Sequence, residues 1–277
     1  MMRKASGWKP TCNADYEWLD EVSNKSDCDI FICSYKTFTP LVKNVAYKVL
    51  IPDSNIFSCS GLACYRCESD DKYKDKHYSE MYVMKNIPST VKRHKYIGFC
   101  HYRRYFSFLD EIPNLDEIFS EYDAISVTPI KFKRSVREQY GAMHNIDDLN
   151  ALEEIVKNDF NDYYDAFKEV MDGNLFYPCN MFIMRTEDFD KYIKFLYDVV
   201  DGKFMRDVIG DDFDAYLERN KDKYIKRFHP NNTLEYQYRV GGYLMERLTN
   251  VFFKKHFSKI KTYDIILTEN KYFKSKG

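Results

Sequence analysis

Short apolar runs alternate with amphipathic segments along most of the chain. The apolar runs are bounded by turn-forming residues and predict buried strands at 29–38, 45–52, 96–106, 122–130 and 175–185. Helices are predicted at 77–87, 149–158, 162–171 and after Thr186, where apolar side chains recur at the spacing of a stripe that packs on a sheet. This alternation predicts an α/β fold, a single domain with a mostly parallel central sheet flanked by helices.

The same pattern predicts where the domain begins and ends. The 277 residues suffice for one large domain with its own core. We place this domain at residues 29–249, because residues 1–28 are polar and aperiodic and read as an N-terminal extension. Residues 250–277 hold seven Lys against one Asp and one Glu, and we expect a basic tail that packs on the domain.

Charge and cysteine content narrow the class of protein. Lys and Arg number 42 against 43 Asp and Glu, a net charge of -1, so the composition disfavours a nucleic-acid partner. Neither a long apolar run nor a signal-peptide pattern is found, which predicts a cytoplasmic protein whose eight Cys are reduced thiols. The basic tail, with Phe252, Tyr263 and Phe273 among its lysines, leaves peripheral contact with a membrane open.

The stretch at 96–106, YIGFCHYRRYF, starts as a buried strand and ends in polar side chains. His101, Tyr102, Arg103 and Arg104 cannot all face a core, because unpaired guanidinium groups are costly to desolvate. Ligands of α/β sheets lie at the carboxyl ends of the strands, and adjacent arginines can hold a diphosphate by bidentate bonds. Glycine-rich phosphate loops of the GxGxxG and GxxxxGK[ST] types are missing from the sequence. Side chains would therefore have to bind any phosphate.

GFCHYRRYF, together with HYSEMYVMKN, YPCNMFIM and YRVGGYLMERL, resembles a family of capsular and exopolysaccharide biosynthesis glycosyltransferases. That family occurs in bacteria and large DNA viruses and was long grouped as a domain of unknown function. The resemblance covers roughly Ile30 to Leu248. It implies a GT-A-like fold that moves a hexose, galactose or a related sugar, from a UDP-type donor to a hydroxyl of a glycan or lipid-linked glycan. SYK at 34–36 and YVMKN at 82–86 depart from the family pattern, so the donor sugar stays open.

The resemblance and the residue chemistry together suggest roles for individual side chains. Arg103 and Arg104 would neutralise the leaving diphosphate, and Glu246, on one predicted helical face with Arg239 and Tyr243, would deprotonate the acceptor hydroxyl. The expected donor-binding residues are Ser34, Tyr35, Lys36, Glu80, His101, Tyr102, Asn180 and Arg239.

Two alternatives remain open at this stage. No metal ligand is assigned, because Arg103 and Arg104 are expected to neutralise the diphosphate. The alternative is a weak site for Mn²⁺ or Mg²⁺, formed by His101 and an acidic neighbour such as Asp70 or Asp71. A module that binds a nucleotide-sugar or nucleic acid without turnover is the alternative to an enzyme.

Overall fold

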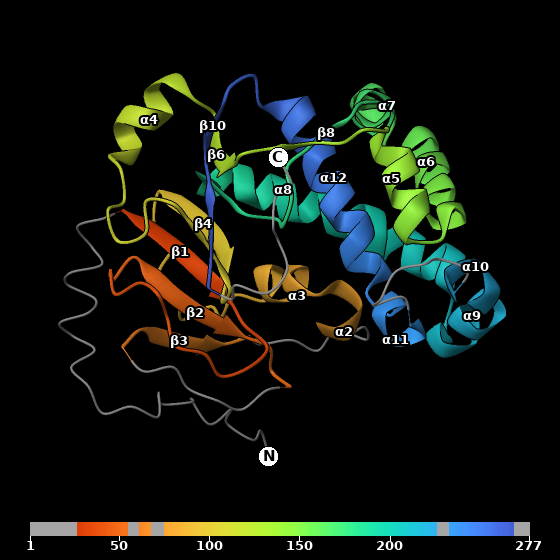
Figure 1. Ribbon diagram of the computed structural model, residues 1–277, viewed down its shortest axis with the longest axis horizontal. Helices are drawn as coiled ribbons and strands as arrows, with labels where there is room; N and C mark the ends of the chain where they lie inside the picture. The colour runs from red at the N-terminus through yellow and green to blue at the C-terminus, as the bar shows by residue number, and fades with distance from the viewer. Residues whose placement is uncertain (1–26, 55–60, 68–74, 226–232, 269–277) are drawn as a thin grey trace, which may run out of the picture.

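The computed structural model describes residues 27–54, 61–67, 75–225 and 233–268, and its centre is a nine-stranded sheet (Figure 1). The strands of this sheet are β1 (Cys28–Cys33), β2 (Tyr47–Ile51), β3 (Ala63–Arg66), β4 (Tyr96–His101), β5 (Arg104–Phe106), β6 (Ala124–Val127), β9 (Phe182–Arg185), β10 (Ile260–Tyr263) and β11 (Ile265–Leu267). The main path runs β10-β6-β9-β4-β1-β2-β3. Strand β9 is antiparallel to both neighbours and the other pairs on this path are parallel, which confirms the predicted α/β fold.

Helices cover the sheet and form a second layer beside it. They are α2 (Asp75–Tyr78), α3 (Glu80–Lys85), α4 (Leu115–Glu121), α5 (Val136–Met143), α6 (Ile146–Asp159), α7 (Tyr164–Asp172), α8 (Thr186–Val199), α9 (Phe213–Arg219), α10 (Lys221–Ile225), α11 (Leu234–Gln237) and α12 (Val240–His256), with a π-helix at Val200–Ile209. Helix α12 contacts α2, α3, α7 and α8. In Figure 1 it runs between the sheet and the cluster of α5, α6 and α7.

Strand alternation decides which side chains face the helices. In β1, Phe31 and Cys33 belong to the core under the helices, while Ile30 and Ile32 belong to the core on the opposite face. Residues i and i+2 of a strand point to the same face, so His101 lies on the helical side with Ile97 and Phe99. The final residue of β4 therefore faces α3 and α12 rather than solvent.

The predicted residue ranges of two strands are wrong, because the structure divides each of them. The stretch 96–106 is not one strand, because the chain reverses at Tyr102 and Arg103 and Arg104 returns opposite His101 as the first residue of β5. The stretch 175–185 is also divided. Leu175–Phe176 forms β8, which pairs with β7 (Ile130–Lys131), and the chain then turns before β9. Both turns fall at the carboxyl end of β4.

Between the predicted strand at 45–52 and the predicted helix at 77–87 the structure has a further strand, because β3 adds to the edge of the sheet beside β2. Its four residues are too short to give a periodic signal, and residues 55–60 and 68–74 on either side, including Asp70 and Asp71, lie outside the described residues.

The C-terminal segment joins the domain in the part that the structure describes. Helix α12 continues through residue 250 to His256, β10 pairs with β6, and β11 pairs with β5. Phe252, one of the three aromatic residues considered for contact with a membrane, is 1% exposed and packs in the core, so it does not contribute to such a contact. Most of the predicted extension (1–26) and the end of the tail (269–277), with Phe273, lie outside the described residues, and the domain boundaries stay predictions.

Two adjacent glycines let α12 approach the corner between α2 and α3. A Cβ atom on Gly242 would lie 2.8 Å from the carbonyl oxygen of Tyr78, and one on Gly241 would lie 2.9 Å from the Tyr78 ring. Ser79, at the corner itself, has a φ of 57°, a conformation that costs free energy for a non-glycine residue. The close approach holds this corner, and with it Glu80, against α12.

We expect Gly242→Ala to lower the free energy of unfolding by about 1–3 kcal/mol, because the new methyl group would overlap backbone atoms that cannot move aside cheaply. Gly202→Ala is the matched control. Its Cβ would meet its nearest neighbour, the Tyr197 carbonyl oxygen, at 3.7 Å, so stability should stay level or rise slightly. Urea unfolding measures both, and equal stabilities would contradict the proposed tight contact.

Candidate active site

The turn that follows β4 contacts the turn that precedes β9. Nε2 of His101 lies 2.5 Å from the carbonyl oxygen of Cys179, and an N–H donates there. His101 is 7% exposed. Burial lowers the pKa of its imidazole, and the neighbouring Arg104 and Arg103 lower it further, against the opposite effect of Glu80.

The turn before β9 holds two successive residues in left-handed backbone conformation. Cys179 has a φ of 72° and Asn180 a φ of 49°, and neither is glycine. Backbone strain of this kind persists only where surrounding contacts hold it, and it is concentrated at functional sites. Asn180 is 2% exposed, and its side chain lies on the helical face of the sheet with that of Phe182.

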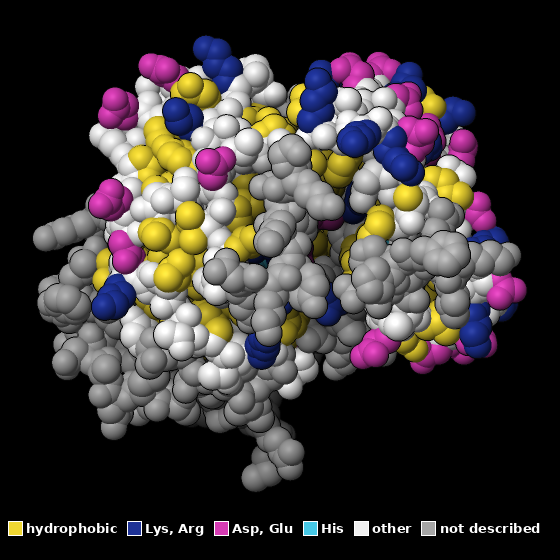
Figure 2. Space-filling view, viewed as in Figure 1, with side chains coloured by type: hydrophobic (Ala, Val, Ile, Leu, Met, Phe, Trp, Pro, Cys, Tyr) yellow, Lys and Arg dark blue, Asp and Glu magenta, His cyan; other side chains and the backbone are white. Residues whose placement is uncertain are grey.

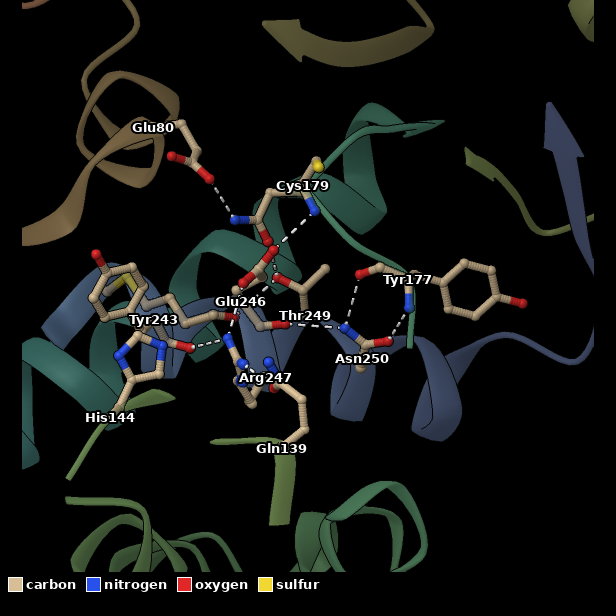
Figure 3. Close-up of polar contacts among 12 residues, drawn as sticks. Glu80, Gln139, His144, Tyr177, Cys179, Tyr243, Glu246, Arg247, Thr249 and Asn250 are labelled. Carbon is tan, nitrogen blue, oxygen red and sulfur yellow. Dashed lines mark hydrogen bonds and ion pairs between the residues drawn. The ribbon is translucent and has the colours of Figure 1, made fainter. Parts of the chain in front are cut away.

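The Asn180 amide is held from both sides. Its Nδ2 donates to Oε1 of Glu80 at 2.8 Å, and its Oδ1 accepts from Oγ1 of Thr249 at 2.9 Å. The Cys179 backbone N–H donates to Oε1 of Glu246 at 2.8 Å. Figure 3 shows Glu80 from α3 and Glu246 from α12 pointing toward this turn. Side chains from α3, α12 and the turn thus converge at the end of β4.

The two carboxyl groups are shifted in opposite directions. Burial raises the pKa of Glu246 and the Glu80 charge raises it further, which outweighs the opposing effect of Arg247. Burial also raises the pKa of Glu80, but His101, the Glu80 backbone N–H and Asn180 together outweigh burial and hold that pKa below its usual value. Carboxyl pairs whose pKa values are pushed apart are typical of acid–base sites. Glu80 stays ionised, whereas Glu246 takes up a proton more readily.

Arg247, which the sequence did not single out, orients Glu246. Its Nη1 donates to Oε2 of Glu246 at 2.9 Å, and its Nη2 donates to Oε1 of Gln139 at 2.7 Å. The guanidinium lies about 5 Å from the ring centres of Tyr140 and Phe176, and its side chain is 4% exposed. The cation beside Glu246 is therefore Arg247 rather than Arg239, which is exposed at the start of α12.

Positive side chains lie beside this cluster. Arg104 is partly buried and lowers the pKa of His101, Cys179 and Glu246, which places its charge near all three. Its guanidinium makes no hydrogen bond or ion pair with any residue that the structure describes. A partly buried guanidinium in this position is suited to an anionic ligand.

Two further cations flank the Tyr102 ring. Cζ of Arg103 lies 5.0 Å from the ring centre and Nζ of Lys36 lies 5.5 Å from it. Lys36 belongs to the segment after β1, where Ser34 Oγ donates to the Lys36 carbonyl oxygen at 2.7 Å. Tyr35 is partly buried in the same segment. Because β1 and β4 are parallel neighbours, both basic segments emerge at the same edge of the sheet.

The predicted residues thus form two sets. Glu80, His101, Asn180 and Glu246, with Arg104 beside them, are brought together, and Ser34, Tyr35, Lys36, Tyr102 and Arg103 lie at the adjoining strand ends. Thr249 and Arg247 were missed, although Thr249 follows Glu246 by one helical turn. Among the described residues, no group of three or more His, Cys, Asp or Glu is arranged to hold a metal ion.

Comparison with known proteins relates the chain to one family and one solved fold. The structure of WbbM, described as a bifunctional glycosyltransferase in its apo form, superposes with a TM-score of 0.62 at 18% identity, covering 89% of this chain and 46% of that one. At this identity the similarity shows the fold alone, and the chain spans about half the length of WbbM. A search of curated proteins finds no match. A family profile described as a domain of unknown function, DUF4422, matches residues 29–220, and the chain belongs to this family.

Proposed function

We propose that this chain is a glycosyltransferase that moves a hexose, galactose or a related sugar, from a UDP-sugar to a hydroxyl of a glycan or lipid-linked glycan. The observation that carries the proposal is the Arg104 guanidinium, which is without an ion-pair partner among the described residues and lies near Glu246, one of two carboxyl groups with oppositely shifted pKa values. A cation for the diphosphate and a base for the acceptor are what sugar transfer from a nucleotide requires. The fold shared with a glycosyltransferase and the resemblance of Gly98–Phe106 support the same reading.

Each group of residues has a role in this proposal. Arg104 and Arg103 bind the diphosphate and stabilise the charge that develops on it as the sugar leaves. Ser34, Tyr35, Lys36 and Tyr102 bind the nucleotide part of the donor at the ends of β1 and β4. Arg239, exposed at the start of α12, stays a predicted donor-binding residue. His101, Glu80 and the Asn180 amide bind sugar hydroxyls.

Glu246 is the proposed general base. Its carboxylate is fixed on one oxygen by the Cys179 backbone N–H and on the other by Arg247, which leaves remaining lone pairs for an acceptor hydroxyl. Its side chain is 21% exposed, so an acceptor can approach it. A raised pKa makes the carboxylate a stronger proton acceptor than an ordinary glutamate.

A nucleotide-sugar is expected to stabilise the fold. A ligand that binds only the native state at 100 times its dissociation constant adds about 2.7 kcal/mol to the free energy of unfolding. Thermal unfolding with UDP, GDP, CMP and their sugar conjugates measures this. UDP compounds should raise the midpoint most, and a flat response across the whole panel would contradict the proposal. Stabilisation without transfer to any acceptor would instead support a binding module.

Turnover is expected to persist in excess chelator and to rise little with added Mn²⁺ or Mg²⁺. The reason is that Arg103 and Arg104 would supply the positive charge that a divalent cation supplies elsewhere. Initial rates with chelator, and after stepwise addition of each metal, measure this. Loss of activity in chelator with recovery on adding metal would overturn it and make His101 with an acidic neighbour the proposed ligands.

Charged side chains of both signs lie on one face of the molecule (Figure 2). On the face shown in Figure 2, lysines and arginines are interspersed with acidic residues over the helical half. Across the described residues, no helix combines the length and the apolar character needed to span a bilayer. A cytoplasmic location remains part of the proposal, and peripheral contact of the basic tail with a membrane stays an open alternative.

A further inference from the structure

A hollow lies beside the segment that leads from β8 to the turn with Cys179 and Asn180. It has a volume of about 370 Å³ and is formed by the end of α7, the β8 segment and the C-terminal half of α12. Tyr177 forms one wall. In Figure 3 the Tyr177 ring points away from Glu246, so this hollow is separate from the carboxylate cluster. Its volume falls within the range of small-molecule sites.

The lining combines aromatic faces with polar groups. Tyr177, Phe253 and Phe257 contribute rings, and Leu175 at the edge is 56% exposed. Five of the twelve lining residues are polar or charged: Glu169, Asn174, Asn250, Lys254 and Ser258. A hydrocarbon chain needs a continuous apolar wall, whereas a pyranose ring presents an apolar face and a rim of hydroxyls. Rings interrupted by polar groups suit the sugar better.

An ion pair lies at the rim of the pocket. Nζ of Lys254 lies 2.6 Å from Oε2 of Glu169, and both side chains are at least half exposed. Such an exposed pair contributes little to stability. Its remaining donors and acceptors are available to hydroxyl groups of a ligand that lies over the aromatic rings.

The side chain of Asn250 connects the pocket wall to Glu246 through hydrogen bonds to the backbone. Asn250 Oδ1 accepts from the Tyr177 backbone N–H at 2.7 Å, and its Nδ2 donates to the Tyr177 carbonyl oxygen at 3.1 Å and to that of Glu246 at 3.0 Å. Two residues after Tyr177, the Cys179 N–H binds the Glu246 carboxylate. The segment that lines the pocket therefore leads directly to the proposed general base.

We propose that this pocket binds a sugar residue of the acceptor glycan, remote from the hydroxyl that reacts. The inference rests on the proposed function, since it assigns the pocket to that function's acceptor. A glycan held against Tyr177 lies next to the turn that carries Cys179 and Asn180, which would favour acceptors of several sugar residues over single sugars.

Saturation-transfer NMR with methyl β-glycosides of galactose and glucose tests the pocket, with UDP in excess so that the donor site is occupied. We expect transfer to the glycoside ring protons and binding about tenfold weaker in Leu175→Glu, which places a charge in the pocket wall. Ile130→Glu is the matched control, because Ile130 is 43% exposed on the paired strand β7 and does not line the pocket. Binding in this control should equal that of the unchanged chain.

Three results would overturn the inference: no saturation transfer to either glycoside, equal transfer in Leu175→Glu, or binding of an alkyl probe such as octanol in place of the glycosides. The thermal response to UDP, measured on the same samples, separates this inference from the proposed function. If UDP stabilises the chain and neither glycoside binds, only the pocket assignment fails. If UDP has no effect either, the transferase proposal fails as well.

Discussion

Glu246→Gln is expected to lower turnover by about 10²–10⁴-fold, the usual contribution of a general base. Glutamine keeps the shape of the side chain and an oxygen for the Cys179 N–H, but it cannot accept a proton from an acceptor hydroxyl. Donor binding should survive, because the diphosphate is assigned to the arginines. The rate of UDP release, measured with the donor that stabilises the fold most and a mixture of glycan acceptors, tests this.

Glu154→Gln, on the exposed face of α6, is the matched control and should leave the rate unchanged. The pH profile gives a second readout. The active form of Glu246 is the carboxylate, so wild-type activity should fall as pH drops through a pKa above the ordinary glutamate range, and the glutamine variant should lose this acid limb. A variant rate within tenfold of wild type would show that Glu246 is not the base and would favour Glu80.

The sequence predicted the inner strands of the sheet better than the turns that place the site. The apolar runs that became β1, β2 and β4 were found because buried parallel strands read as continuous apolar segments. The reversal at Tyr102 and Arg103 carries no glycine, proline, asparagine or aspartate, so nothing in its residue types signals a turn. The left-handed conformations of Ser79 and Cys179 were not predictable either, because neither residue type favours a positive φ.

The convergence of the site residues was predictable in part. The rule that ligands lie at the carboxyl ends of strands placed His101, whereas Asn180 was expected in the site only from the family resemblance and lies before β9, a strand antiparallel to β4. The environment of Glu246 was not predictable, because it depends on how closely α12 packs against the α2–α3 corner and on a buried Arg247. A lone arginine in a helix reads as a solvated charge, since arginines are mostly exposed. Only the tertiary contacts with Gln139, Tyr140 and Phe176 reveal its role.

The second large effect is expected for Arg104→Ala, with turnover reduced by about 10²–10³-fold, the scale seen when one group that stabilises developing charge is removed. In the described part of the chain the Arg104 side chain has no hydrogen bond or ion pair to lose, so thermal stability without ligand should change little. The stabilisation by UDP should shrink at the same time, because the diphosphate loses a cation. Arg104→Lys should recover only part of both, since lysine cannot form a bidentate pair.

Arg103→Ala should also lower turnover, through the cation that lies on the Tyr102 ring, and Arg134→Ala, exposed before α5, is the control that should change neither rate nor UDP response. If only the overall positive charge of the protein mattered, replacing Arg134 would lower the rate as much as replacing Arg104. A loss confined to Arg104 would show that the position of its guanidinium matters. Full activity in both Arg103→Ala and Arg104→Ala would mean that the arginines at the end of β4 do not bind the donor. The diphosphate would then have to be bound elsewhere, and the main support for the transferase proposal would be gone.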